Sequence, residues 1–173
     1  MKSISVYVLA SLIVKRERSG SYENWANEIG LPVATLFRSV KTLRQVKLIT
    51  ETVDGDVPNY QNAEKFLLYG FPFCFHAEKG KLVRGFKTGV DATSLRNEFA
   101  EVDYPAVWPH HKGDVKGFGI KPLHPSIPEQ VAEGKMDKNL YELLALLDTV
   151  CVGQAREVKA AQEKIKEILN DHE

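Results

Sequence analysis

The chain has 173 residues, which is long enough for one domain, or for a small and a medium domain that share a core. Hydrophobic residues make up 43% of the sequence and charged residues 27%, proportions that are ordinary for a globular protein and exclude a disordered or membrane-embedded chain. The 23 basic residues are balanced by 23 acidic ones. A neutral chain argues against a broad electrostatic contact with nucleic acid, so the distribution of charge matters more than its sum.

The basic residues are concentrated in one short stretch. Residues 1–60 contain eight basic and six acidic groups, whereas residues 61–173 contain fifteen and seventeen. Four basic residues and no acidic ones lie between Val33 and Leu48. A local basic patch on a neutral protein is typical of a short DNA contact. The four residues are Arg38, Lys41, Arg44 and Lys47.

The cysteines and the first apolar run bear on the compartment. Nothing in the spacing of Cys74 and Cys151 demands a disulfide, and we expect reduced thiols in the core. The apolar run near the start stops at Lys15-Arg16, lacks a basic leader and is too short to span a bilayer. These features predict a cytoplasmic protein that has no membrane partner.

Three helices are predicted in the first third of the chain. Apolar residues at three- and four-residue steps predict a helix over 4–17 with one buried stripe. Ser21 can cap a second helix, over about 22–29, and Pro32 suits the first turn of a third, over about 32–46.

A short β-hairpin is predicted to follow the third helix. Residues 47–53 alternate as in a strand, Asp54-Gly55 is a turn signal, and residues 57–60 can form the return strand. Pro58 limits that strand to an edge.

The middle of the chain predicts a small sheet. A short helix over 62–69 would end at Gly70. Phe71, Phe73 and Phe75 would lie before a hairpin turn at Glu78-Lys79-Gly80, with Leu82 and Phe86 after it. A further helix is predicted over 91–101, and the segment 103–128, rich in Pro, Gly and His, predicts irregular or short-strand structure.

The chain closes with two predicted helices. Asp137 or Asn139 can cap a helix to Val150 that is apolar over most of its circumference, and Gly153 would separate it from a narrower amphipathic helix over 154–170. These helices can complete the core or form a dimer interface, and both alternatives are open. The predicted fold class is α+β, with an N-terminal domain over 1–60, a small-sheet middle domain over 61–136 and C-terminal helices over 137–173.

The segment from Tyr22 to Ile49 has the features of a helix-turn-helix. Ala26 is the small residue needed where the third helix crosses the second, and Gly30 tolerates the positive φ of the turn. Apolar residues that would lock the two helices together are Trp25, Ile29, Leu31, Leu36, Val40 and Leu43.

The opposite face of the third helix is the candidate DNA-binding surface. At about 100° per residue, Arg38 and Lys41 point away from the predicted core. Arg38 can read a guanine edge, Phe37 can contact a thymine methyl group, and Lys41 and Arg44 suit phosphate contacts. The full set of candidate DNA-binding residues is Val33, Ala34, Thr35, Phe37, Arg38, Lys41, Thr42, Arg44 and Gln45.

The N-terminal segment resembles the MarR-like and related bacterial winged-helix regulators. The shared features are Ala26, Gly30, Leu31, the stretch Thr35-Leu36-Phe37-Arg38, Leu43 and Leu48-Ile49. The resemblance covers residues 4–60 and departs in the wing, where Asp54 and Asp56 replace the usual basic tip.

A second resemblance covers residues 66–125. Tyr69-Gly70, Arg84-Gly85, Thr88 and Val107-Trp108-Pro109 are similar to an uncharacterised group of bacterial winged-helix proteins. Some of these are encoded beside nucleotidyltransferase-type toxins, so the resemblance implies a toxin as a candidate partner.

Other chemistry has weaker signals. Cys74, His76, His110 and His111 are zinc-ligand types without a strong ligand spacing, and no motif indicates a catalytic residue. Arg84 and Trp108 can line a pocket for an anionic aromatic effector, although packing of the middle domain is the favoured interpretation.

The sequence therefore predicts a regulator, most simply a repressor, that binds double-stranded DNA as a homodimer, because helix-turn-helix proteins usually read paired half-sites. It is not expected to be an enzyme or to hold a cofactor or metal. The alternatives are an antitoxin-like protein that binds a toxin and autoregulates its operon, a protein-interaction scaffold, or a small-molecule or metal-dependent enzyme.

Overall fold

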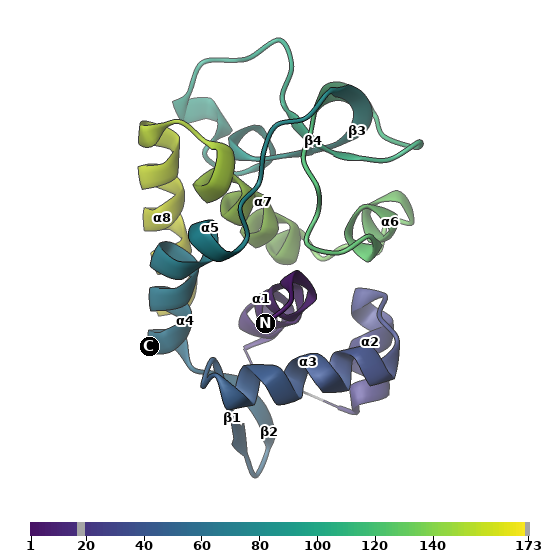
Figure 1. Ribbon diagram of the computed structural model, residues 1–173, viewed down its shortest axis with the longest axis vertical. Coiled ribbons are helices and arrows are strands. Elements are labelled where there is room, and N and C mark those ends of the chain that lie inside the picture. The colour runs from purple at the N-terminus through teal and green to yellow at the C-terminus, as the bar shows by residue number, and fades with distance from the viewer. Residues whose placement is uncertain (17–19, 172–173) are drawn as a thin grey trace.

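The computed structural model describes residues 1–16 and 20–171 and has the predicted mixed α+β fold (Figure 1). The second and third helices and a hairpin lie at one end of the molecule, and a small barrel of three strands lies at the other. Residues from the first, middle and last segments of the chain contribute to one hydrophobic core.

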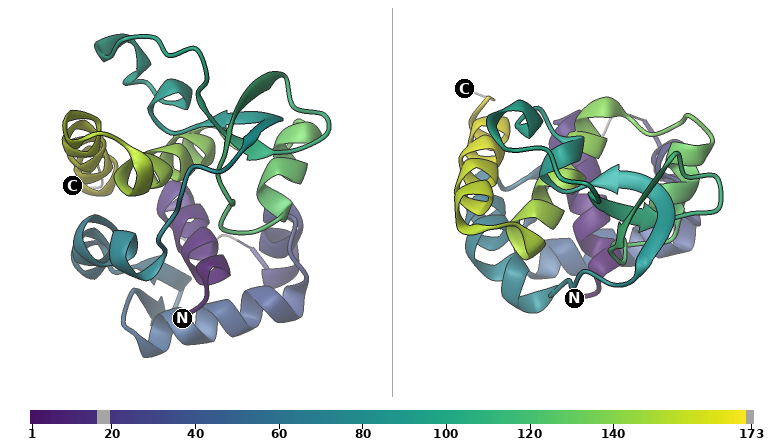
Figure 2. Two further views of the ribbon diagram at one scale, coloured as in Figure 1. Left: turned by 45° about the horizontal axis from the view of Figure 1, so that its top comes forward. Right: turned by 90° about the horizontal axis from the view of Figure 1, so that it is seen from above.

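Helix α1, Ser3–Lys15, lies in the centre of the molecule (Figures 1 and 2). Nine consecutive residues, from Ser5 to Ile13, are buried. The predicted single buried stripe is therefore wrong: α3 and β2 contact the helix, and so does α7 from the C-terminal part of the chain. The described part of the predicted helix ends at Lys15, and residue 17 lies outside the described residues.

Two buried polar side chains connect α1 to α2, Tyr22–Ile29. The Tyr7 hydroxyl donates to the Ile29 carbonyl oxygen at 2.9 Å, and Trp25 Nε1 donates to Ser11 Oγ at 2.9 Å. Because buried polar groups must find partners, these bonds fix the orientation of α2 on the central helix.

The helix-turn-helix elements follow the predicted boundaries closely. Ser21 Oγ accepts a hydrogen bond from the Asn24 N–H at 3.2 Å, as expected of a cap, and α2 ends at Gly30, whose φ is +68°. Helix α3 is Val33–Gln45, and Pro32 occupies its cap position. The predicted interface is confirmed, because each of its residues is buried. These are Trp25, Ile29, Leu31, Leu36, Val40 and Leu43.

The predicted wing is present as strands β1, Ile49–Thr52, and β2, Gly55–Pro58. They pair antiparallel, with Thr52 opposite Gly55, and Asp54 lies in the turn between them.

The predicted end of a helix at Gly70 is wrong. Helix α4, Tyr60–Lys65, continues through a π-helical segment, Phe66–Gly70, into the short helix α5, Phe71–Cys74. Gly70 keeps right-handed helical dihedrals, with φ −100° and ψ −42°, so it does not terminate the helix.

The alternation of Phe71, Phe73 and Phe75 does not mark a strand. Phe71 is buried and packs against Phe66 and Phe75, with ring centroids 6.5 and 5.6 Å apart, whereas Phe73 is 86% exposed. Phe71 and Phe75 are four residues apart, as neighbours on one helix face are, and Phe66 and Phe71 are five apart across the π-helical segment, so neither contact comes from alternation. No hairpin therefore turns at Glu78-Lys79-Gly80.

The three strands of the barrel pair across long separations. Strand β3, Leu82–Thr88, runs antiparallel to β4, Ala106–Pro109, and to β5, Val115–Gly119. A short parallel pairing of β4 with β5 closes the barrel, which confirms the short strands expected in 103–128.

The barrel is so narrow that two glycines are required at one crossing. A Cβ atom on Gly113 would lie 2.3 Å from the Cα of Gly85, and one on Gly85 would lie 2.1 Å from the Trp108 carbonyl oxygen. No side chain fits at either position, so the fold of the barrel requires glycine at both.

The helix predicted over 91–101 is reduced to two short 3-10 helices, Val90–Ala92 and Arg96–Glu98. Helix α6, Ser126–Ala132, then packs against α2 and β3.

The C-terminal helices complete the core. Asp137 Oδ1 caps α7, Lys138–Val152, by accepting from two backbone N–H groups at 2.9 Å. Gly153 separates it from α8, Ala155–Asn170, as predicted. Because α7 is covered by α1, α8 and the barrel, its apolar surface is used within the monomer and gives no support to a dimer interface.

A buried carboxylate joins α7 to the barrel. Asp148 Oδ2 accepts hydrogen bonds from Thr88 Oγ1 at 2.6 Å and from Trp108 Nε1 at 2.8 Å. Burial raises the pKa of Asp148 to about 6, although both hydrogen bonds favour the charged form. Trp108 is thus a packing residue, which agrees with the favoured interpretation of the middle domain.

We expect Asp148→Asn to change how stability depends on pH. The raised pKa means that the native wild type holds one proton more than the unfolded chain between about pH 4 and pH 6. The contribution of Asp148 to the free energy of unfolding therefore decreases by about 3 kcal/mol as the pH rises through that window. Asn does not titrate, so the variant should not show this decrease. Denaturant unfolding at pH 4 to 7 measures the difference between the two proteins.

That difference should move in favour of the Asp148→Asn variant as the pH rises and level off above pH 6. Thr88→Val removes a hydrogen bond that lowers the pKa of Asp148, so in this variant the free energy of unfolding should continue to decrease to a higher pH than in the wild type. A pH-independent difference between wild type and Asp148→Asn would contradict the raised pKa.

Candidate nucleic-acid interface

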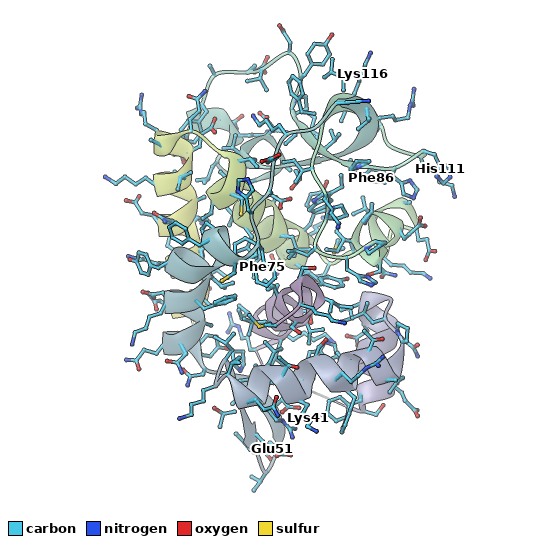
Figure 3. The ribbon with its side chains drawn as sticks, in the orientation of Figure 1. Lys41, Glu51, Phe75, Phe86, His111 and Lys116 are labelled. Carbon is cyan, nitrogen blue, oxygen red and sulfur yellow. The ribbon has the colours of Figure 1, made fainter. Side chains whose placement is uncertain are left out.

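The outer face of α3 is accessible, as the predicted DNA-binding role requires. Arg38 and Lys41 are exposed, and Lys41 extends outward from the helix (Figure 3). Arg38 Nε donates to the Ala34 carbonyl oxygen at 3.2 Å, and among the described residues its two terminal amino groups have no partner. The planar donor pair of Arg38 is thus available to an external acceptor.

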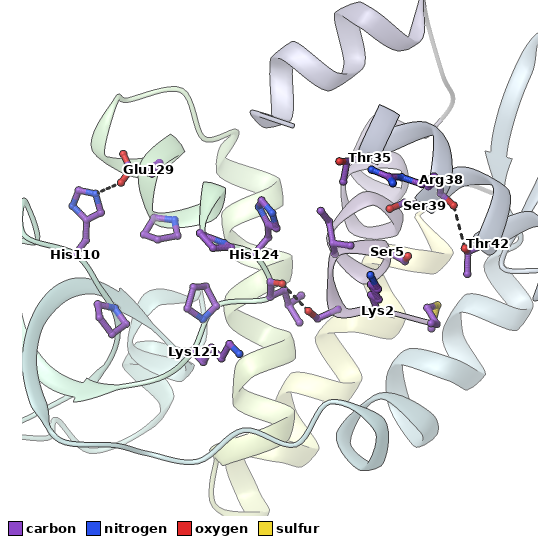
Figure 4. A pocket seen from close by; sticks show the side chains of 18 of the residues that line it. Lys2, Ser5, Thr35, Arg38, Ser39, Thr42, His110, Lys121, His124 and Glu129 are labelled. Atoms are coloured by element: carbon purple, nitrogen blue, oxygen red, sulfur yellow. Dashed lines mark hydrogen bonds and ion pairs between the residues drawn. The ribbon is translucent and has the colours of Figure 1, made fainter. Parts of the chain in front are cut away.

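A groove of about 1470 Å³ lies beside this face (Figure 4). One wall is α3, and the opposite wall is formed by the barrel and the segment 119–125, with the first residues of α1 between them. Five of the nine predicted DNA-binding residues line it. They are Thr35, Arg38, Lys41, Thr42 and Gln45.

The charge of the groove is strongly one-sided. The groove is lined by five Lys and Arg side chains and by a single carboxylate, that of Glu129. Glu129 Oε1 lies 2.9 Å from His110 Nε2. Within the described ranges none of its four lysines forms an ion pair. The positive residues of the groove are Lys2, Arg38, Lys41, Lys81 and Lys121.

His124 adds no charge to the groove at neutral pH. Burial lowers the pKa of His124 below its usual value, so the ring is neutral. The Ser126 backbone N–H donates to His124 Nδ1 at 3.1 Å, which places the ring proton on Nε2.

The other predicted residues lie away from the groove. Val33, Ala34 and Phe37 are exposed on α3, and Phe37 packs edge-on against Tyr22 with ring centroids 5.8 Å apart. Phe37 is 56% exposed, so part of its ring can still contact a ligand.

Arg44 is held by an intramolecular cluster. Its Nε donates to Asp56 Oδ1 at 2.8 Å, and its other nitrogens lie 3.0 Å from Glu51 Oε2 and from the Tyr22 hydroxyl. Tyr22 in turn donates to Asp56 Oδ2 at 2.7 Å. The guanidinium fixes the wing to α2 and α3, which is a different use from the predicted phosphate contact.

The prediction that Asp56 belongs to an acidic wing tip is wrong. Asp56 is completely buried under Arg44 and Tyr22, whereas Asp54 is exposed at the turn. The sequence signal for the buried pair was an Asp in a strand position, where carboxylates are depleted unless paired.

The weaker candidate sites are not assembled. Within residues 1–16 and 20–171 no group of three or more His, Cys, Asp or Glu side chains could hold a metal ion. Arg84 donates to the Gly113 carbonyl oxygen at 3.2 Å within the barrel. Both cysteines are free thiols, but Cys74 is exposed, so its expected place in the core is wrong.

Sequence reasoning missed the far wall of the groove. Lys81 and Lys121 are distant from α3 in the chain, and only the closure of the barrel places them opposite it. Single lysines in loop-rich sequence gave no signal of this arrangement.

Comparison with known proteins adds no further assignment: no family model matches the chain, and no curated protein or solved structure matches it significantly. Among the helices of the described part of the chain, none has both the length and the apolar character to cross a membrane.

We expect Asp56→Ala to lower the free energy of unfolding by about 3 kcal/mol, because it removes the buried acceptor shared by Arg44 and Tyr22. The matched control is Asp54→Ala, two residues earlier at the exposed turn, which should change stability by less than about 0.5 kcal/mol. Urea unfolding of both variants tests this. Equal effects of the two substitutions would show that the buried cluster does not hold the wing in place.

Proposed function

We propose that the protein binds double-stranded DNA through α3 and acts as a transcriptional regulator, most simply a repressor. The observation that carries the proposal is the exposed outer face of α3, where Arg38 and Lys41 form no ion pair with any described residue and lie beside a cationic groove.

The order α1-α2-α3-β1-β2, with α3 as the second helix of the turn motif, supports this function. In helix-turn-helix proteins this helix enters the major groove, and residues near its N-terminus contact base edges. Arg38 lies on the outer face in the first half of α3, and Lys41 lies one turn later, where the helix leaves the groove. We assign base readout to Arg38 and phosphate contact to Lys41.

A homodimer remains part of the proposal, since paired half-sites are usual for this class. The burial of α7 removes one of the two reasons for placing the interface on the C-terminal helices, while α8 keeps half-buried apolar residues at Val158 and Ile168. The antitoxin-like alternative stays a prediction from sequence, because no described feature identifies a toxin-binding surface.

We expect Arg38→Ala to weaken binding to the preferred duplex by about 1–3 kcal/mol and to relax sequence preference at one base pair per half-site. Lys41→Ala should weaken binding to all duplexes equally and lower the salt dependence. The preferred duplex is first selected from a random library with the wild-type protein. Titrations against that duplex, single mismatches and a scrambled duplex, at several salt concentrations, then separate the two roles.

Lys65→Ala is the matched control, since Lys65 is exposed on α4 and outside the groove. Equal weakening of every duplex by Arg38→Ala would show that the base-readout assignment of Arg38 is wrong. Unchanged binding by both α3 variants would remove α3 as the recognition helix and favour a protein-interaction scaffold.

A further inference from the structure

The two flanks of α3 differ in charge. A helix that lies in the major groove has one sugar–phosphate backbone passing on each side of it. On one flank are Phe37, Arg44 and the wing, and on the other are Thr35 and Thr42, which face the groove. A duplex held by α3 therefore meets two different surfaces.

The wing flank is poorly suited to phosphate. Glu51 is 66% exposed there and Asp54 is exposed at the turn, while the guanidinium of Arg44 is already held by Asp56. Carboxylates near a phosphate backbone oppose binding, and the Arg44 guanidinium that lies among them is already paired.

The groove flank has the opposite character. Lys81 and Lys121 are exposed on the wall that faces α3, and Lys2 lies between the walls (Figure 4 shows Lys2 and Lys121). These lysines are free of ion pairs within the described part of the chain, so no internal partner has to be displaced when they neutralise an external anion.

The shape and lining of the groove favour a duplex backbone over other anions. Its volume of about 1470 Å³ exceeds the roughly 300–1,000 Å³ of small-molecule sites, and its positive charges are exposed rather than enclosed. No Phe, Tyr or Trp among the described residues lines it, so it lacks the aromatic platform on which single-stranded bases stack.

We propose that this groove holds the sugar–phosphate backbone of one strand of the duplex whose major groove receives α3, with Lys81 and Lys121 contacting its phosphates. The proposal rests on DNA binding through α3. It assigns to the barrel the phosphate contacts that the acidic wing does not provide.

The test combines Lys81→Gln and Lys121→Gln in one full-length variant. Each lost phosphate contact lowers the slope of log K against log salt by about 0.9, so the double variant should lose about 1.8. Affinity at 0.1 M salt should fall about 10- to 100-fold, equally for the preferred and scrambled duplexes. Lys116→Gln, on the same barrel but outside the groove, is the matched control and should change neither quantity (Figure 3). Thermal unfolding of each variant checks that the fold is intact.

Phosphate-ethylation interference gives a second readout. Wild type should be sensitive to ethylation on both sides of the contacted major groove, and the double variant should lose the sensitive phosphates of one backbone only.

If the double variant kept the wild-type slope while Arg38→Ala still lost sequence preference, the groove proposal would be overturned and α3 binding would stand. The lysines would then point to an acidic protein surface. If the α3 variants also had no effect, the proposed function itself would fail.

Discussion

The structure depends on the burial of the middle of α1, from Ser5 to Ile13. Its apolar residues between Val6 and Ile13 point to every side, so the helix-turn-helix can cover only part of them. Full burial of a Val, Leu or Ile side chain stabilises a fold by about 1.5–3 kcal/mol, and α1 has five such residues at no more than 1% exposure. The sum is comparable to the whole net stability of a typical domain, about 5–15 kcal/mol. The N-terminal and C-terminal parts of the chain therefore depend on each other for a stable fold.

The same helix holds both walls of the groove. Helix α3 packs directly on α1, and the Ser3 hydroxyl at the start of α1 donates to the Leu123 carbonyl oxygen of the opposite wall at 2.8 Å. Helix α6 meets the end of α2 so closely that a Cβ on Gly30 would lie 2.4 Å from Gln130 Nε2. A groove fixed in this way needs little ordering when a ligand enters, which favours affinity.

The parts of the fold that could be predicted are those with local signals. The cap at Ser21, the left-handed Gly30 and the apolar spacing of α3 each act within a few residues, and the helix-turn-helix followed from them. The continuation of α4 beyond Gly70 could not be predicted, because a π-helical segment shifts the helical spacing of Phe66 and Phe71.

The barrel and half of the candidate site could not be predicted from the sequence for a different reason. Val83 pairs with Gly117, and Phe86 pairs with Trp108, across more than twenty intervening residues. Such pairings are set by the whole fold and leave no local pattern. The outward residues of α3 could be identified from periodicity, but the lysines that face them could not.

The use of Arg44 links the structure of the wing to the distribution of charge around α3. Asp56 is completely buried, and a buried carboxylate without a partner is strongly destabilising, so its pairing with Arg44 is a structural requirement. That pairing anchors the hairpin to Tyr22 and α3 but withdraws a cation from the wing flank, where Glu51 and Asp54 remain. The lysines of the groove lie on the opposite flank, so the two flanks of α3 differ in charge. The need to pair one buried carboxylate thus makes the two flanks of α3 differ in charge, and the sequence of α3 alone does not show this difference.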